Sequence, residues 1–136
     1  MIGAMRLALN NAGLLPQNID CIYANANSTQ DADLVETKAI KDVFGGSAYK
    51  IPVSAVKSMT GESFSASGGL ALAAGVGSLE NDFIAPTVNL EVSEPQCDLD
   101  YVPNIARQQR VDKIMVNSFG PNGANSVLVI GRRNQK

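Results

Sequence analysis

The stretch from residue 51 to residue 69 constrains the fold of this chain more than any other. Residues 51–56 form a short apolar run that predicts a buried strand. Residues 63–79 consist mainly of Ala, Gly and Ser, and no charged residue lies between Glu62 and Glu80. A helix without charges is buried on most of its sides, so we expect a central packing helix there. The loop between strand and helix is where α/β proteins place their chemistry.

Helical and strand patterns alternate along the rest of the chain. Helices are expected at 1–12, 31–44 and 63–79, strands at 19–24, 51–56, 113–118 and 126–131, an extended segment at 83–90 and a brief strand at 101–102. Strands that alternate with helices run parallel, and the connection 119–124, made of Phe, Gly, Pro, Asn and Ala, predicts an antiparallel hairpin. We therefore expect an α/β fold: one domain over residues 1–136, with a mixed sheet of about five strands, helices on both faces and a C-terminal antiparallel hairpin.

Composition excludes several classes of function. The chain has no His, which excludes a Ser-His-Asp triad, a Cys-His pair and a His-ligated metal site within it. A net charge of −2 argues against nucleic-acid binding, and no apolar run reaches the length of a membrane span. Cys21 and Cys97 lack metal-site spacing, and Cys21 is expected to be a buried thiol. Without a signal-peptide pattern, we expect a cytoplasmic protein, with no metal and no cofactor.

Five ordered motifs carry a resemblance to a known family. They lie at residues 4–20, 23–40 (which begins YANANST), 57–68 (KSMTGESFSASG), 85–89 (APTVN) and 97–104 together with 117–125. In this order the motifs resemble the C-terminal half of a β-ketoacyl-ACP synthase, a condensing enzyme of the thiolase fold. The resemblance covers essentially the whole chain.

The resemblance implies a reaction and its partners. In the family, a cysteine in the N-terminal half takes up the acyl chain. Two histidines in the C-terminal half assist decarboxylation of malonyl-ACP and stabilise the oxyanion, a lysine tunes the electrostatics, and a loop phenylalanine gates the acyl pocket. The implied partners are an acyl carrier protein and the N-terminal synthase half, which supplies the nucleophile; neither Cys21 nor Cys97 matches that cysteine.

The chain departs from the family at catalytic positions. Asn25 and Glu62 stand where the two histidines are expected, Ala71 replaces a carboxylate, and Pro121 replaces the gating phenylalanine. The retained position next to the second histidine is Lys57, so the resemblance places Asn25, Lys57 and Glu62 at the catalytic positions. Thr29, Phe119, Gly120, Pro121 and Asn125 fall at substrate-binding positions, and Asp33 and Glu36 are predicted structural acids at the start of the 31–44 helix. Phe119 and Asn125 are as readily explained by shaping the hairpin turn.

The two replaced histidines differ in their consequences. The Asn25 amide can still donate a hydrogen bond to an oxyanion. An ionised Glu62 cannot donate, and at about 4 Å it would repel the malonyl carboxylate by roughly 4 kcal/mol at an effective dielectric constant of about 20. We therefore expect Glu62 to pair with Lys57 or to cap the helix that follows.

These substitutions leave three functions open. The first is a degenerate, noncatalytic condensing-enzyme half in fatty-acid or polyketide synthesis, similar to the chain-length factors that pair with an active synthase. The second is half of a working 3-oxoacyl-ACP synthase in which Asn25 and Glu62 are atypical site residues. The third is an inactive gene fragment. Alone, the domain would expose the apolar side of its 63–79 helix, so we expect a homo-oligomer or a heterodimer.

Overall fold

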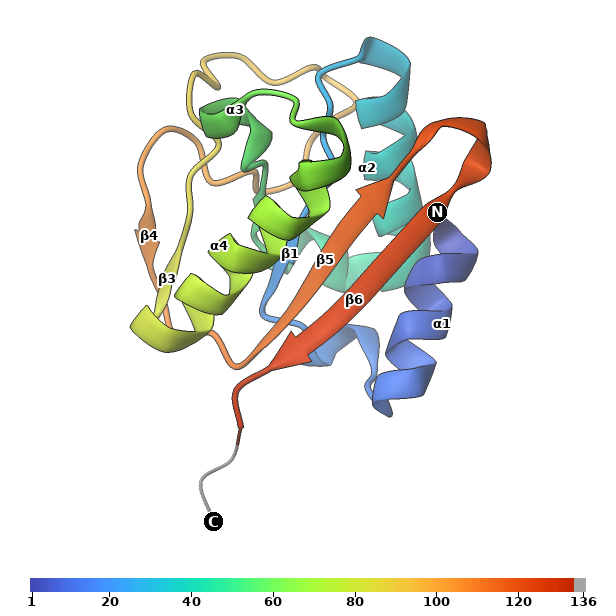
Figure 1. The fold of residues 1–136 in the computed structure, drawn as a ribbon, viewed down its shortest axis with the longest axis vertical. Helices are drawn as coiled ribbons and strands as arrows, with labels where there is room; N and C mark the ends of the chain where they lie inside the picture. The colour runs from blue at the N-terminus through green and yellow to red at the C-terminus, as the bar shows by residue number, and fades with distance from the viewer. Residues whose placement is uncertain (134–136) are drawn as a thin grey trace.

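A four-stranded mixed sheet forms the centre of the molecule (Figure 1). The computed structural model describes residues 1–133, apart from the side chains of Gln30 and Pro121. The strand order is β2-β1-β5-β6, and β1 (Cys21–Tyr23) pairs in parallel with both β2 (Val53–Ser54) and β5 (Lys113–Phe119). The last strand, β6 (Asn125–Gly131), runs antiparallel to β5 over its whole length, so the predicted hairpin is confirmed.

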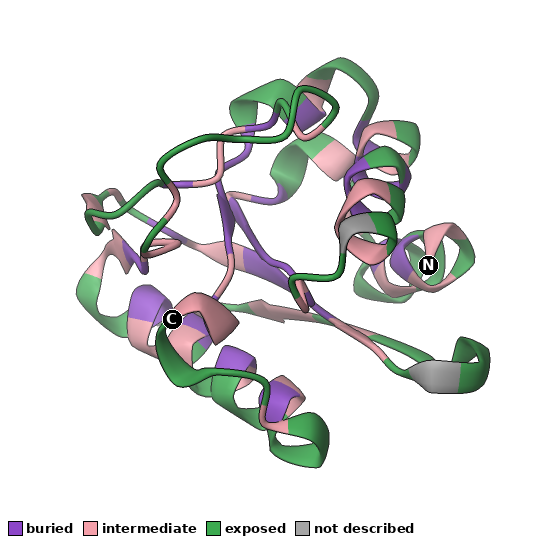
Figure 2. Ribbon diagram, turned by 90° about the horizontal axis from the view of Figure 1, so that it is seen from above, coloured by how far each residue is buried: buried purple, intermediate pink, exposed green. Residues whose placement is uncertain are grey.

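Helices cover both faces of this sheet, as predicted. Helices α1 (Ile2–Ala12) and α2 (Gln30–Phe44) lie on one face and α4 (Ser67–Asn81) on the other (Figures 1 and 2). The shorter helices are α3 (Lys57–Thr60) and the 3-10 turns η1 (Pro16–Asn18), η2 (Gly45–Lys50), η3 (Phe64–Ala66) and η4 (Pro121–Gly123). None of the described helices is long and apolar enough to cross a membrane.

The sheet separates two hydrophobic cores. Successive side chains of a strand point to opposite faces. On β1, Cys21 and Tyr23 therefore pack in the core under α4, whereas Ile22 packs in the core under α1 and α2. On β5, Met115 joins the α1/α2 core, and its neighbour Ile114 joins the α4 core. The three buried residues of β1 thus contribute side chains to both cores.

The predicted sheet of about five strands has to be corrected. The main sheet contains four strands, and β3 (Phe83–Ile84) pairs with β4 (Arg107–Gln108) in a separate two-stranded ribbon. The ladder of the 83–90 segment ends at Ile84, two residues before Pro86, which has no N–H to donate. The predicted strand at 101–102 is absent because Val102 has a φ of +48°, outside the β region.

The 51–69 stretch also differs in detail from its prediction. Lys57 begins one turn of helix, α3, instead of a loop, and this turn ends at Gly61, whose φ is +72°. The long helix of small residues forms, but its regular part begins at Ser67. A Cβ atom at Gly75 would lie 3.3 Å from Cδ1 of Ile130, so this glycine lets the helix approach the sheet closely.

Only the side of α4 that faces the sheet is buried. Leu70 and Val76 lie on the outer side, with 38% and 42% of their surface exposed. The expectation that this helix is buried on most sides is therefore wrong for the chain by itself.

Candidate active site

Asn25 follows strand β1 in the segment that leads to α2. The residue is 8% exposed, and its Oδ1 accepts hydrogen bonds from Lys57 Nζ at 3.2 Å and from the backbone N–H of Phe119 at 3.1 Å. Both bonds fall on the same atom, so they fix the orientation of the amide. Its Nδ2 is left as the donor that this residue can offer.

Glu36 fixes the backbone of the Asn25 loop through hydrogen bonds. This buried residue lies in the second turn of α2, and its carboxylate accepts the N–H groups of Asn25 and Ala26 at 2.9 and 2.8 Å, and Nδ2 of Asn117 at 3.0 Å. Burial raises the pKa of Glu36, and these three donors oppose the rise. The sequence had suggested a helix-dipole role for this acid, whereas its contacts fix a loop.

Glu62 forms the ion pair with Lys57 that we considered for it, but it does not cap α4, whose N-cap is Ala66. Its Oε2 lies 2.9 Å from Lys57 Nζ, and its Oε1 accepts hydrogen bonds from Ser67 Oγ at 2.6 Å and from the N–H of Phe64 at 2.8 Å. The Ser67 hydroxyl, followed by Lys57, lowers the pKa of Glu62 to about 2. Glu62 is therefore ionised at neutral pH and bridges Lys57 to the start of α4.

Asn117 completes this group, although the sequence did not single it out as a site residue. It is 1% exposed on β5 and lines a small void of about 10 Å³ together with Lys57 and Ala71. Ala71 contributes only a methyl group where the resembled family carries a carboxylate. The available signal was a polar residue within an otherwise apolar strand, since a buried amide needs partners.

Three of the predicted substrate-binding residues lie in the hairpin turn, and one of them, Phe119, contacts Asn25. Phe119 contributes its backbone N–H, while its ring packs against the core under α1 and α2. The N–H of Gly120 donates to the carbonyl of Ala124 at 2.7 Å, and Asn125 Nδ2 donates to the carbonyl of Gly123 at 2.8 Å. The contacts of Gly120 and Asn125 thus lie within the turn.

Three further predictions concern Pro121, Thr29 and Asp33. The side chain of Pro121 lies outside the described residues. Thr29 is the N-cap of α2, and its hydroxyl donates to Asn27 Oδ1 at 2.7 Å. Asp33 lies in the first turn of α2 and is half-buried. Neither Thr29 nor Asp33 contacts Lys57 or Glu62 through a described hydrogen bond. The substrate-binding role of Thr29 and Pro121 stays a prediction, as does the structural role of Asp33.

Neither cysteine is placed to act as a nucleophile beside Lys57. Cys21 is fully buried under α4, and this burial raises the pKa of its thiol, so the thiolate is disfavoured. Cys97 is free and half-buried, and its sulfur accepts a hydrogen bond from Thr37 at 3.5 Å. Within the described residues, no group of three His, Cys, Asp or Glu side chains is arranged to hold a metal ion.

The sequence is similar to that of known proteins. Residues 1–91 match the family described as "Beta-ketoacyl synthase, C-terminal domain". The 3-oxoacyl-[acyl-carrier-protein] synthase 2 of Coxiella burnetii is 44% identical over 128 residues, which are 94% of this chain and 31% of that protein. The tetracenomycin polyketide synthase ketoacyl synthase alpha subunit of Streptomyces glaucescens is 42% identical over 132 residues, again 31% of its length. The chain thus spans under a third of the curated relatives it matches.

Solved structures share the fold. A type II PKS acyl-carrier protein in complex with its ketosynthase superposes with a TM-score of 0.95 at 33% identity, covering 98% of this chain and 33% of the other. The ishigamide ketosynthase/chain length factor superposes with a TM-score of 0.92 at 38% identity, covering 96% of this chain and 32% of the other. These similarities confirm the predicted fold class.

Proposed function

The chain belongs to the β-ketoacyl synthase C-terminal domain family, and from that premise we propose that it is a degenerate, noncatalytic condensing-enzyme half of fatty-acid or polyketide synthesis. The observation that carries the proposal is the ion pair between Lys57 and Glu62, 2.9 Å apart at a family catalytic position. At this position Glu62, a hydrogen-bond acceptor, stands where the family has a histidine that donates. Glu62 also pairs with the retained Lys57.

The chemical loss follows from the protonation state of Glu62. Decarboxylative condensation develops negative charge on an oxygen, which needs a hydrogen-bond donor directed at it. With a pKa lowered to about 2, the carboxylate has no proton to donate at neutral pH. Removing one such donor typically costs about 10²- to 10³-fold in rate.

Glu62 repels a malonyl carboxylate less strongly than an unpaired carboxylate would. The roughly 4 kcal/mol that we assigned to an unpaired carboxylate at about 4 Å assumes no neighbouring cation. Lys57 lies 2.9 Å from Glu62 and offsets much of that field. The missing donor is therefore the larger effect, and the pair also withholds the lysine charge from a substrate carboxylate.

A binding and scaffolding role agrees with the exposed apolar surface. Large apolar side chains are exposed to solvent on α4, on η3 before it and on β6. The exposed fractions are 84% for Phe64, 38% for Leu70, 42% for Val76 and 47% for Leu128. Such a surface marks an interaction site. We propose that it is covered by an N-terminal synthase half or a second chain, as a homo-oligomer or as a heterodimer with an active synthase. An acyl carrier protein is the further proposed partner, and the expected cytoplasmic location stays a prediction.

The decisive experiment restores the missing imidazoles. The Asn25→His/Glu62→His double variant, in the protein that carries an N-terminal half, should gain malonyl-ACP decarboxylation relative to the unmodified protein. Glu91→His, at an exposed position outside the site, is the matched control and should gain nothing. If the unmodified protein already decarboxylates and condenses at the rate of a normal synthase, the noncatalytic proposal is wrong.

A working 3-oxoacyl-ACP synthase half, with the nucleophilic cysteine on the N-terminal half, remains the second candidate. The fixed amide of Asn25 favours it, because Nδ2 is left as an oriented donor. Under this alternative, Asn25→Ala would abolish condensation, whereas under the noncatalytic proposal it would change no activity. Sequencing the DNA upstream of Met1 separates both from an inactive gene fragment: an in-frame cysteine-containing half supports an enzyme, and a neighbouring complete synthase gene supports a partner.

A further inference from the structure

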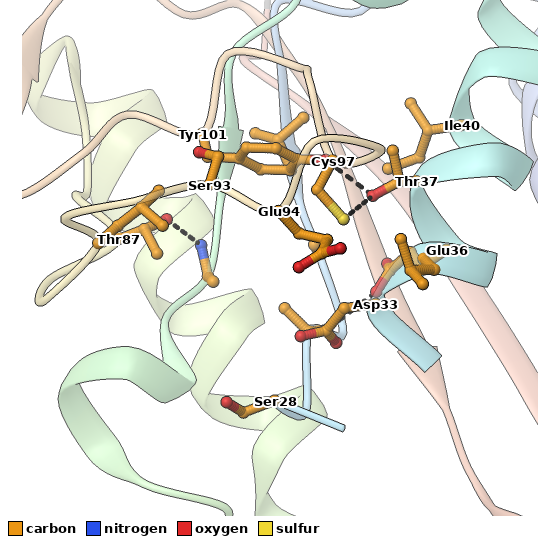
Figure 3. A pocket seen from close by; sticks show the side chains of 16 residues that line it. Ser28, Asp33, Glu36, Thr37, Ile40, Thr87, Ser93, Glu94, Cys97 and Tyr101 are labelled. Atoms are coloured by element: carbon orange, nitrogen blue, oxygen red, sulfur yellow. Dashed lines mark hydrogen bonds between the residues drawn. The ribbon is translucent and has the colours of Figure 1, made fainter. Parts of the chain in front are cut away.

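A second cavity lies on the α2 side of the Asn25 loop (Figure 3). Its volume is about 320 Å³, within the range of small-molecule sites. It is lined by the ends of β1 and β2, by residues 33–40 of α2 and by the segment 87–101. Asn25, Lys57 and Glu62 do not line it, so it is separate from the candidate active site.

The walls of this cavity are largely apolar. Ala24 and Ala55 follow the two strands, Leu34 and Ile40 come from α2, and Leu90 belongs to the covering segment. No Lys or Arg side chain is among the described residues that line it. Apolar walls with a few polar groups are typical of sites for compact organic ligands.

Two carboxylates that are not tied up in the loop line the cavity, one from a half-buried residue and one from an exposed residue. Asp33 projects from α2 and Glu94 from the covering segment (Figure 3). A third acid, Glu36, also lines the cavity, but its carboxylate accepts three hydrogen bonds from the loop and from Asn117. Asp33 and Glu94 are therefore the groups that a ligand can use.

The charge of Asp33 is incompletely compensated. Its Oδ1 atom is buried and has no hydrogen-bond partner within the described part of the chain. Burial raises the pKa of Asp33, and the backbone of Ser28 and Asn27 opposes the rise only in part. The nearby cation, Lys57, is engaged by Asn25 and Glu62. A half-buried carboxylate with one buried, unpaired oxygen favours a ligand that brings a positive charge.

We propose that this cavity binds a small organic cation, with a primary ammonium group between Asp33 and Glu94 and a compact apolar body against the aliphatic walls. The ammonium donates hydrogen bonds to both carboxylates. The ligand would contact Ala24 and Ala26, the two neighbours of Asn25 in the chain.

Three probes of similar size and different charge test this site. The 136-residue chain is titrated by calorimetry with benzylamine, benzyl alcohol and benzoate. We expect benzylamine to bind roughly tenfold more tightly than benzyl alcohol and benzoate to bind most weakly. Asp33→Asn and Glu94→Gln should each remove most of this preference, whereas Glu91→Gln, an exposed acid of the same segment that does not line the cavity, should keep it.

A second variant separates loss of the site from loss of the fold. Ala55→Leu fills the cavity without removing a charge and should weaken benzylamine and benzyl alcohol alike, with an unchanged circular dichroism spectrum. The proposal is overturned if the folded protein binds no benzylamine, if the three probes bind equally, or if Ala55→Leu leaves their binding unchanged. Because the active-site residues are not involved, the result is independent of whether the domain catalyses condensation.

Discussion

Replacing Glu62 by Gln removes one negative charge and keeps the size of the side chain. In the folded protein the pKa of Glu62 lies at about 2, below its ordinary value of 4.5. A carboxylate whose pKa is lowered by folding stabilises the protein fully above the unfolded value, and the contribution is lost as the pH falls from 4.5 through 2. A tenfold change in proton affinity corresponds to about 1.4 kcal/mol, but the side chain is 36% exposed and solvent screens its pairing. We therefore expect Glu62→Gln to lower the free energy of unfolding by about 1 kcal/mol at pH 7.

The pH dependence of this difference is the sharper measurement. Urea denaturation followed by far-ultraviolet circular dichroism, at several values between pH 7 and pH 3, gives the free energy of unfolding of both proteins. The difference should be constant above pH 5 and should shrink to roughly half at pH 3, where the wild-type carboxyl begins to lose its advantage. Glu80→Gln, an exposed acid on α4, serves as the control and should show no such trend. A difference that stays constant down to pH 3, or a variant as stable as the wild type at pH 7, would refute the reasoning.

Three further substitutions test other contacts. Glu36→Gln turns an amide N–H toward the backbone N–H of Ala26, and leaving this donor unpaired should cost about 2 kcal/mol in denaturation, with no change in compactness. Tyr23→Phe removes a hydroxyl that lies 2.6 Å from Ser78 Oγ in the core. In the same denaturation assay this variant should lower the free energy of unfolding by about 1–3 kcal/mol. Val76→Lys places a charge on the exposed side of α4, and light scattering should show a shift from homo-oligomer toward monomer. A wild-type chain that is already a clean monomer would contradict the homo-oligomer.

The sequence was most informative where a local pattern decides the structure. Helix 31–44 was predicted within one residue of its start, because acids in the first turn and Gly45 after the last turn mark its ends. The hairpin was predicted from its turn residues in the same way. The strands at 51–56 and 101–102 were less well predicted, because strand length depends on the partner: only Val53 and Ser54 pair with β1, and Val102 adopts a left-handed conformation.

The site was predictable to the extent that it depends on motifs. The resemblance located Asn25, Lys57 and Glu62, and the structure brings these three together through hydrogen bonds and an ion pair. It could not indicate that Glu36 binds the loop. Nor could it indicate that Asn117 binds Glu36, since these two residues are 81 positions apart in the chain. Which donors meet the amide oxygen of Asn25, and which oxygen of Glu62 meets which donor, are likewise properties of the folded geometry.

The pairing of β1 with β5 sets the order in which this chain can fold during its synthesis. Cys21 lies opposite Ile114 in that ladder, and just before it the carboxylate of Asp20 accepts the N–H of Lys113, 93 residues later. Strand β1 therefore gains its second neighbour, β5, only after residues 113–119 have left the ribosome. Until then both faces of β1 lack half of their cores, and loop closure over such a distance is slow. The segment between β1 and β5 thus remains open to chaperones and to aggregation until β5 has been synthesised.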